Sequence, residues 1–525
     1  MTDAARGGAV TSVDGLVLRG EADRPALTWQ DTTIDYAELH RRVTGTAAGL
    51  LGLGLARGDR VAVYLEKRIE TVVALLAVSA AGGVFVPVNP VSKAPQIGHI
   101  VGDCAARVVV TTAERYATVR TALAENASVE HVVVVGGPLP GEDAGHAGTV
   151  AWDELPALGA GRTLPAVVET DLAAILYTSG STGAPKGVVL THRNLLAGAE
   201  SVATYLGNTA DDVVLAALPL SFDAGFSQLT TALYAGAHLV LANYLLPVDL
   251  VRLCARHGVT GITGVPPLWM QLTGCRWPEE ATRNLRYFAN TGGRMPRSTL
   301  ERLRELFPNA RPYLMYGLTE AFRATYLDPA QVDRRPDSIG KAIPNAEVSV
   351  VRPDGTPCDP YEHGEIVQRG PLVAQGYWND PARTAERFRP APGGGAGGGA
   401  VRPETAVWSG DRAYRDDEGY LYFVGRDDEM IKTSGYRVSP TEIEEAAYGT
   451  GLVTAAVAFG VPDERLGQHA VLVVAGDTSE SDLRKALEER MPRYMMPRRV
   501  VFLEALPVSP NGKFDRVATR RAVTA

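Results

Sequence analysis

Apolar segments alternate with amphipathic segments along the first part of this 525-residue chain. Between residues 25 and 137, stretches with helical periodicity separate four apolar runs of strand length, RVAVYL (60–65), VFVPVNP (84–90), ARVVVTT (106–112) and HVVVVGG (131–137). Strand, helix and strand repeated in this order predict a parallel sheet covered by helices on both faces. Such sheets bind ligands beyond the carboxyl ends of their strands. We therefore expect an α/β fold whose site is built from the loops after the strands.

The apolar run DLAAILY (171–177) leads directly into TSGSTGAPKG (178–187), a loop of glycines and hydroxyl side chains that contains Lys186. Glycines let a backbone approach an anion closely and expose its N–H groups, and hydroxyls and a lysine bind phosphate oxygens. A flexible linker has a similar composition, but it has no reason to follow a buried strand or to end in a lysine. We predict a phosphate-binding loop that includes Thr178, Ser179, Gly180, Ser181, Thr182, Gly183 and Lys186.

The order Pro-Lys-Gly at residues 185–187 distinguishes this loop from the common P-loop. In the P-loop the lysine follows a glycine and precedes a serine or threonine. A kinase or a motor ATPase is therefore disfavoured, and another class of nucleotide-binding enzyme is expected.

Length and pattern predict two domains. The chain exceeds the size at which a single core keeps growing. After about residue 427, a helical segment (441–450), two apolar strands and a second helical segment indicate a small α+β unit. We predict a large α/β domain over residues 1–427 and a small mobile domain over residues 428–525. The glycine-rich stretch at residues 390–400 is expected to be a surface insertion.

Charge and cysteine spacing narrow the list of partners. The net charge of −8, without a basic tract, argues against nucleic acid and anionic membranes as partners. The N-terminus does not resemble a signal peptide and no apolar run reaches the length of a membrane span, so we expect a cytoplasmic protein. The four cysteines lack CxxC spacing and predict neither a zinc site nor a disulfide framework.

Further short motifs follow the loop at 178–187 along the chain: YGLTE (316–320), SGDR (409–412), GRDD (425–428) and PNGK (510–513). Together they resemble the signature motifs of the AMP-forming adenylating superfamily. This superfamily contains acyl-CoA ligases, luciferases and the adenylation domains of peptide synthetases. The resemblance covers nearly the whole chain, and it implies an enzyme that uses ATP and Mg²⁺ to join a carboxylic acid to a thiol.

The resemblance also implies roles for the residues that bind nucleotide and metal. Glu320 matches the metal ligand of the superfamily, and a carboxylate beside the hydroxyl of Thr319 suits magnesium and phosphate chemically. Asp411 and Arg426 match residues that contact the ribose, and Tyr316 belongs to the same nucleotide site. None of these roles would be assigned from a glutamate or a turn alone.

Two lysines are expected to serve opposite half-reactions. Lys513 matches the lysine that stabilises charge while a carboxylate oxygen attacks the α-phosphate. Lys432, in KTSGYRV (432–438), matches a loop that the small domain inserts for thiol transfer. The small domain must therefore adopt two arrangements of comparable free energy.

Asp223 follows Phe222 in LPLSFDAGFSQ (218–228), as in the motif with which amino-acid-activating members bind the α-ammonium group. An aspartate after an apolar strand can instead cap the next helix, and both interpretations stay open here. Arg323 is unexpected in an amino-acid pocket. Facing inward it could pair with a second acid or a polar substrate group, and facing outward it would meet solvent or backbone carbonyls. The family's pocket, carried over position by position, predicts Asp223, Ala224, Ser227, Gly264, Asn290, Gly292, Met315, Arg323 and Ala324.

The acid and its acceptor complete the expected function. FDAGFSQLTTALYAGA, YFANTGGRMP and MYGLTEAF are also similar to acyl-CoA ligase-like proteins associated with exosortase gene systems, a similarity that does not identify the acid. No carrier domain follows PNGK, so the acceptor thiol is expected on a separate partner. We expect adenylation of a small or polar amino acid and its transfer to the phosphopantetheine of an acyl or peptidyl carrier protein. The alternative is an acyl-CoA ligase that joins a non-amino carboxylic acid to CoA.

Overall fold

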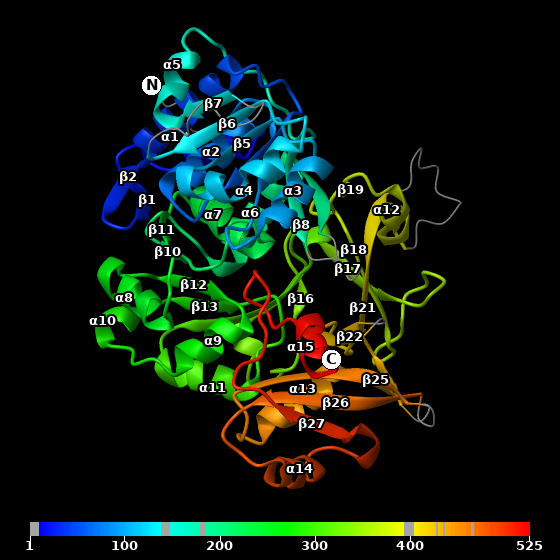
Figure 1. Cartoon of the computed structure of the whole chain (residues 1–525). Helices are drawn as coiled ribbons and strands as arrows, with labels where there is room; N and C mark the ends of the chain where they lie inside the picture. Colours follow the sequence, from blue (N-terminus) through cyan, green and yellow to red (C-terminus); the bar gives the residue numbers. More distant parts are fainter. Residues whose placement is uncertain are drawn as a thin grey trace.

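The computed structural model of the chain describes residues 10–137, 148–178, 185–392, 404–426, 429–433, 436–463 and 467–524. Four sheets and the helices that flank them make up this part of the chain (Figure 1). The predicted phosphate-loop residues Ser179 to Gly183, the two aspartates of GRDD and most of the glycine-rich stretch lie outside the described residues.

The first large sheet has eight strands, of which six run parallel. In spatial order they are β19 (Gly376–Tyr377), β9 (Lys186–Thr191), β8 (Leu172–Thr178), β4 (Val84–Pro87), β3 (Arg60–Tyr64), β5 (Val108–Thr112), β6 (His131–Val135) and β7 (Gly148–Ala151). The pairs β8–β9 and β9–β19 are antiparallel. The helices that alternate with these strands are α2 (Ile69–Ala80), α3 (Ala94–Asp103), α4 (Ala113–Ala124), α5 (Leu155–Leu158) and α6 (His192–Leu206).

The second large sheet has nine strands, again with a parallel centre and antiparallel edges. In spatial order they are β16 (Lys341–Ala342), β15 (Thr325–Leu327), β14 (Arg311–Tyr316), β13 (Tyr287–Asn290), β12 (Gly261–Gly264), β10 (Val213–Ala216), β11 (His238–Leu241), β1 (Pro25–Trp29) and β2 (Thr32–Asp35). Its helices are α1 (Tyr36–Gly52), α7 (Asp223–Ala235), α8 (Pro247–His257), α9 (Pro266–Thr273), α10 (Glu279–Thr282) and α11 (Arg297–Leu306).

A third, antiparallel sheet stands beside the two large ones, and the sequence patterns did not predict it. Its strands are β17 (Glu347–Val351), β18 (Gly364–Arg369), β20 (Phe388–Pro390), β21 (Thr405–Arg415) and β22 (Leu421–Arg426), with α12 (Pro381–Arg387) before β20. SGDR lies inside β21, the first strand of the β21–β22 hairpin. Asp411 pairs in register with Arg426 across β21 and β22, which places the two side chains next to each other.

The last hundred residues form the fourth sheet and its helices, which lie at the bottom of Figure 1 in orange and red. Its elements are β23 (Ile431–Thr433), β24 (Tyr436–Val438), α13 (Pro440–Gly449), β25 (Ala455–Asp463), β26 (Gly467–Ala475), α14 (Glu480–Glu488), β27 (Arg499–Phe502) and α15 (Arg516–Thr524). The predicted boundary at residue 428 has no direct test and stays a prediction.

The main core lies between the two large sheets. Helix α2 contacts β3 and β4 of one sheet and β1 of the other, and nearly all of its residues are buried. Its sequence IETVVALLAVSA is apolar on every side, as is typical of a helix enclosed by protein. Helix α1 is amphipathic instead, and its N-cap Asp35 accepts a hydrogen bond from the Glu38 backbone N–H at 2.7 Å.

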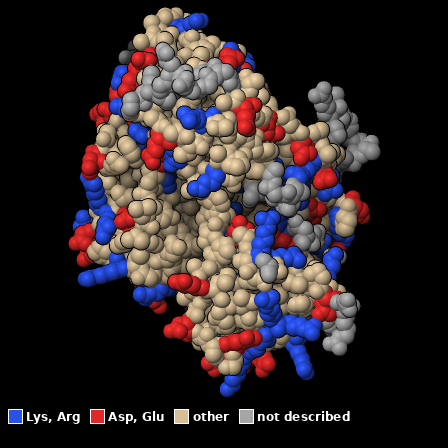
Figure 2. Space-filling view, in the orientation of Figure 1, with Lys and Arg blue, Asp and Glu red and all other residues tan. Residues whose placement is uncertain are grey.

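The surface has mixed charge. Figure 2 shows acidic and basic side chains interspersed over one face of the molecule. Among the helices that the structure describes, none is long and apolar enough to cross a lipid bilayer. The four cysteines are all free thiols.

Candidate active site

A cleft of about 380 Å³ opens where the loops after β8, β13 and β14 meet the β21–β22 hairpin and the loop that precedes α15. This is the location expected for a ligand of open, mostly parallel sheets. Figure 1 shows that last loop, in red, extending from the C-terminal sheet to the green strands. The cleft brings together the predicted residues Thr178, Lys186, Asn290, Gly292, Met315, Tyr316, Thr319, Glu320, Asp411, Arg426 and Lys513.

Lys186 and Glu320 form an ion pair on one wall of the cleft. Lys186 Nζ lies 2.9 Å from Glu320 Oε1, and the hydroxyl of Tyr377 contacts both, accepting from Lys186 at 2.9 Å and donating to Glu320 at 2.6 Å. Burial alone would raise the pKa of Glu320, but the charge of Lys186 and these hydrogen bonds outweigh it and lower the pKa. Glu320 is therefore held as a carboxylate with a cation beside it.

Tyr377 was missed by the sequence analysis. It lies in the two-residue strand β19, which pairs with β9 and so reaches Lys186 from a position far along the chain. The sequence QGYW (375–378) has no feature from which this strand pairing could be predicted.

Asp411 lies on the opposite wall. Its Oδ2 accepts from the hydroxyl of Tyr316 at 2.6 Å, and its Oδ1 lies 3.3 Å from Arg426 Nε. Burial raises the pKa of Asp411, and the charge of Arg426 and the hydrogen bond from Tyr316 offset this rise only in part. A buried carboxylate with a neighbouring cation is suited to accept hydrogen bonds from paired hydroxyls.

Lys513 enters the cleft on a tight hairpin. The Gly512 N–H donates to Ser509 O at 2.8 Å, and Gly512 adopts a φ of 80°, which favours glycine. The ammonium lies 4.7 Å from the centre of the Phe222 ring. Burial lowers the pKa of Lys513, and the negative charge of Asp223 opposes this shift.

Gly292 makes the approach of Lys513 possible. A Cβ atom added at Gly292 would lie 2.5 Å from Lys513 Cε, closer than real contacts allow. Its φ of 76° also favours glycine.

Asp223 and Arg323 form a buried ion pair, with side chains 5% and 3% exposed. Arg323 Nη1 donates to Asp223 Oδ2 at 3.2 Å and to the carbonyl of Phe322 at 3.1 Å. Asp223 is the first residue of α7, Phe222 occupies the N-cap, and Asp223 Oδ1 has no partner among the described residues, so the capping interpretation is wrong. Arg323 faces inward, directly after Phe322, whose positive φ of 54° is uncommon for a bulky side chain.

A separate small cavity lies behind Met315. The predicted pocket residues Ala224, Ser227, Met315 and Arg323 line it together with Thr231. Gly264 and Ala324 line neither space: a Cβ at Gly264 would meet the Trp269 ring at 2.9 Å, and Ala324 is fully buried. The predicted substrate set is thus divided: some members line the cleft, others line this cavity, and Asp223, Gly264 and Ala324 line neither.

Lys432 is not brought to the cleft. It is exposed on β23, and its backbone N–H donates to Gln468. In the arrangement observed here, Lys513 and not Lys432 occupies the cleft.

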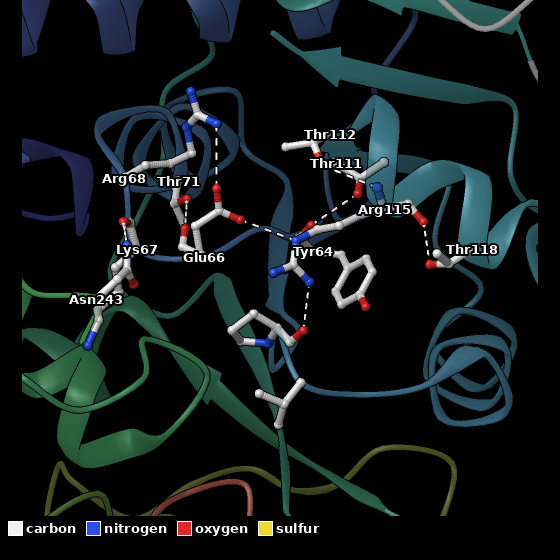
Figure 3. Close-up of polar contacts among 12 residues, drawn as sticks. Tyr64, Glu66, Lys67, Arg68, Thr71, Thr111, Thr112, Arg115, Thr118 and Asn243 are labelled. Carbon is white, nitrogen blue, oxygen red and sulfur yellow. Dashed lines mark hydrogen bonds and ion pairs between the residues drawn. The ribbon is translucent and has the colours of Figure 1, made fainter. Parts of the chain in front are cut away.

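A third space of about 410 Å³ lies on the other side of the Lys513 hairpin. Asn511 lines both this space and the cleft. Among the described residues around this third space, Lys67 is the only charged side chain. Lys67 donates to the Ala217 carbonyl at 2.7 Å, and burial lowers its pKa to about 7. Figure 3 shows Lys67 beside Asn243, and Glu66 between Arg68 and Arg115.

A cleft at the carboxyl ends of parallel strands, lined by a lysine–glutamate pair, a buried aspartate and a second lysine, is typical of an enzyme that binds a nucleotide. A family model for AMP-binding enzymes matches residues 17–378, and one for the C-terminal domain of AMP-binding enzymes matches residues 442–513. The chain therefore belongs to the AMP-forming adenylating superfamily and is an AMP-forming acid–thiol ligase.

Curated relatives differ in the acceptor that their names give. The chain is 35% identical over 516 residues to the L-proline–[L-prolyl-carrier protein] ligase of Streptomyces coelicolor (94% of this chain, 93% of the relative). It is 32% identical over 498 residues to the feruloyl-CoA synthase of an Amycolatopsis species (93% and 94%). It is 31% identical over 500 residues to the tyrocidine synthase 3 of Brevibacillus parabrevis, of which it spans 7% while the match covers 92% of this chain.

Solved structures have the same fold. The O-succinylbenzoate coenzyme A synthetase of Bacillus subtilis in complex with ATP and magnesium superposes with a TM-score of 0.81 at 26% identity, covering 97% of this chain and 99% of that chain. The large α/β part and the small C-terminal part are both included in this match.

Proposed function

We propose that this ligase activates an amino acid with ATP and transfers it to the phosphopantetheine thiol of a separate carrier protein. One atom carries the amino-acid part of the proposal: Asp223 Oδ1, which is buried and has no hydrogen-bond donor among the described residues. A buried polar group left without a partner costs about 1–3 kcal/mol, and more when it is charged. The α-ammonium group of an amino acid would supply the missing donor.

The walls of the cleft fit the other substrate, ATP. Asp411 would accept hydrogen bonds from the ribose hydroxyls, with Tyr316 and Arg426 holding its carboxylate in place. Lys186 and the hydroxyl of Thr178 would contact the phosphates from the opposite wall.

Glu320 would hold Mg²⁺ together with the phosphates of ATP. Within the described part of the chain no group of three His, Cys, Asp or Glu side chains could bind a metal on its own. Mg²⁺ in nucleotide sites is bound through one or two carboxylates plus phosphate oxygens, so a single glutamate fits this ion. When bound, magnesium neutralises charge on the leaving pyrophosphate.

In the proposed first step, a carboxylate oxygen of the amino acid bonds to the α-phosphorus while the bond to pyrophosphate breaks. No general base is needed, because the carboxylate is already ionised. Lys513 would stabilise the charge that develops on the α-phosphate. In the second step the sulfur of a thiolate attacks the carbonyl carbon, the carbonyl–oxygen bond to AMP breaks, and AMP leaves with its electron pair.

We propose that the part from residue 428 onward changes its orientation between the two steps. Lys513 occupies the cleft in the arrangement observed, which suits adenylation, and Lys432 is exposed. Exchange of the two lysines requires a hinge near the proposed boundary, and ligands that favour one arrangement shift the populations.

In this proposal the phosphopantetheine arm of the carrier protein enters through the third space, which the nucleotide does not occupy. It is lined largely by apolar side chains and reaches Asn511 beside the cleft. Next to it, Arg68 and Arg115 both pair with Glu66, and Lys67 bonds to backbone carbonyls (Figure 3). The phosphates of CoA would have to compete for these cations, and this favours the carrier protein over CoA.

The test is ATP–pyrophosphate exchange with matched pairs of acids, each amino acid beside its des-amino analogue. We expect the amino members to be preferred. Asp223→Ala should weaken amino acids at least tenfold in kcat/KM, the scale of losing a hydrogen bond to a charged group, and affect des-amino acids less. Asp249→Ala is the control, because Asp249 accepts a hydrogen bond from the Leu246 N–H at the start of α8 and lines none of the three spaces.

A preference for des-amino acids would contradict the proposal and make this chain an acyl-CoA ligase. The acceptor is tested separately, by single-turnover transfer from preformed adenylate to a phosphopantetheinylated carrier protein or to CoA.

A further inference from the structure

The Asp223–Arg323 pair is incompletely bonded on both sides. Arg–carboxylate pairs commonly make two parallel hydrogen bonds. Here a single nitrogen, Arg323 Nη1, contacts a single oxygen, Asp223 Oδ2, at 3.2 Å. Asp223 Oδ1 and Arg323 Nε are both buried and lack partners among the described residues. The site therefore has one unused acceptor and one unused donor.

The unused donor belongs to a residue that borders a small polar space. Arg323 lines the cavity behind Met315 together with Ser227 and Thr231. The Thr231 hydroxyl is also buried without a partner in the described part of the chain. Buried polar groups normally find partners, and a ligand group that accepts hydrogen bonds would satisfy both residues. The cavity has a volume of about 20 Å³ in the arrangement observed, so only a small group at the end of a short side chain would occupy it.

Charge balance identifies that ligand group. In the observed pair the charges of Asp223 and Arg323 cancel, and the ammonium of Lys513, 4.7 Å from the centre of the Phe222 ring, adds a positive charge near them. An α-ammonium bound at Asp223 would add a positive charge to this buried site. Buried charges are paired, and the α-carboxylate of the same molecule reacts at the α-phosphate and does not reach Arg323, so a further negative group is the best match for this site. A carboxylate on the substrate side chain supplies it and meets the guanidinium of Arg323.

We propose that the acid activated by this enzyme is a short amino acid with a second carboxylate on its side chain, bound by Arg323. This inference rests on the proposed function, because it requires Asp223 to bind the ammonium group. Arg323 thereby determines specificity and takes no part in the chemical step.

The experiment compares four substrates of the purified wild-type protein in ATP–pyrophosphate exchange: aspartate, asparagine, 2-aminobutyrate and succinate. Asparagine has nearly the same shape as aspartate without the charge, 2-aminobutyrate has an apolar side chain of similar reach, and succinate lacks the ammonium. We expect kcat/KM for aspartate to exceed those for the other three at least tenfold.

Arg323→Met tests the residue itself. It removes the charge at similar length, and we expect the activity with aspartate to fall roughly a hundredfold, mainly through KM, with little loss for 2-aminobutyrate. Arg323→Lys, which keeps the charge, should retain part of the preference for aspartate. Arg286→Met is the matched control: Arg286 bonds through two nitrogens to the buried Asp212 and lines none of the three spaces described.

Each outcome separates the two proposals. A preference for 2-aminobutyrate or asparagine overturns the proposal that the substrate has a second carboxylate, and it leaves the proposal of amino-acid activation intact. A preference for succinate over aspartate overturns the ammonium at Asp223, and with it the proposed function. The wild-type comparison decides between these outcomes even if Arg323→Met does not fold, which a melting curve will reveal.

Discussion

The hydroxyl of Tyr377 is held between a cation and an anion, Lys186 and Glu320. Tyr377→Phe removes both hydrogen bonds and keeps the ring that faces Lys186. Glu320 would then pair with Lys186 alone, and the lysine would be less available to phosphate. We expect kcat/KM for ATP to fall roughly tenfold, the scale of a hydrogen bond to a charged group, as measured by pyrophosphate exchange.

The control for this substitution is Tyr361→Phe, because Tyr361 is 58% exposed. Equal activity of the two variants would show that Tyr377 only fills space beside Lys186. A loss of kcat/KM with an unchanged kcat would assign the hydroxyl to ATP binding.

At the residue scale, the sequence predicted which side chains belong to the site but not which of them contact each other. Lys186 was identified because a loop with a phosphate-binding composition follows an apolar strand, and Glu320 and Lys513 were identified because YGLTE and PNGK resemble motifs of the superfamily. The contacts of Tyr377 and Arg323 depend on strand register and on a left-handed turn between residues distant in sequence. Such contacts leave no local pattern, so neither the lysine–tyrosine contact nor the aspartate–arginine pair could be predicted.

The hairpin that carries Lys513 directs this side chain to a position that fits against a residue without a Cβ atom. Gly292→Ala would place a Cβ 2.5 Å from Lys513 Cε. We expect adenylate formation to fall at least tenfold, because Lys513 could no longer take its position. Thiol transfer from preformed adenylate should change much less, which single-turnover assays of each step would measure.

Gly451→Ala is the matched control. Gly451 has a similar φ of 70°, and no atom lies within 4 Å of an added Cβ. Both variants lose about 1 kcal/mol of stability from the left-handed backbone. Equal loss of adenylation in the two would mean that backbone strain, and not the contact with Lys513, explains the effect.

At the element scale, strands of the parallel centres were predicted well and the antiparallel sheet was not. Strands such as β3 and β4 are buried on both faces, so their sequences are continuously apolar and easy to recognise. Strand β21 alternates buried and partly exposed residues and contains SGDR, a sequence typical of a turn. Its pairing with β18 joins segments about 45 residues apart, a distance that local patterns do not cover.

At the scale of the whole molecule, Glu445 of α13 contacts the large part of the chain. Its Oε1 lies 3.3 Å from Arg294 Nε, with Arg297 and Asp337 close by. Burial raises the pKa of Glu445, and the charge of Arg294 offsets the rise only in part. The arrangement observed therefore binds a proton at Glu445 more tightly than an undocked arrangement would, and it becomes relatively less favoured as pH rises through this raised pKa.

Glu445→Gln should therefore stabilise this arrangement at neutral pH. We expect thiol transfer to slow by a few-fold relative to adenylation, and the pH dependence of this ratio in the acidic range to flatten. The ratio of the two single-turnover rates across pH measures both effects. Glu442→Gln, at an exposed position on the same helix, is the control, and an identical ratio in both variants would contradict the linkage.

Asn511 borders the nucleotide cleft on one side and the apolar space on the other. A single loop therefore forms part of the wall of both spaces. For the proposed reaction, we expect this loop to separate the thiol from the acyl group while Lys513 is in place. In the proposed rearrangement this loop leaves together with Lys513, so we expect adenylation to precede entry of the thiol in each turnover.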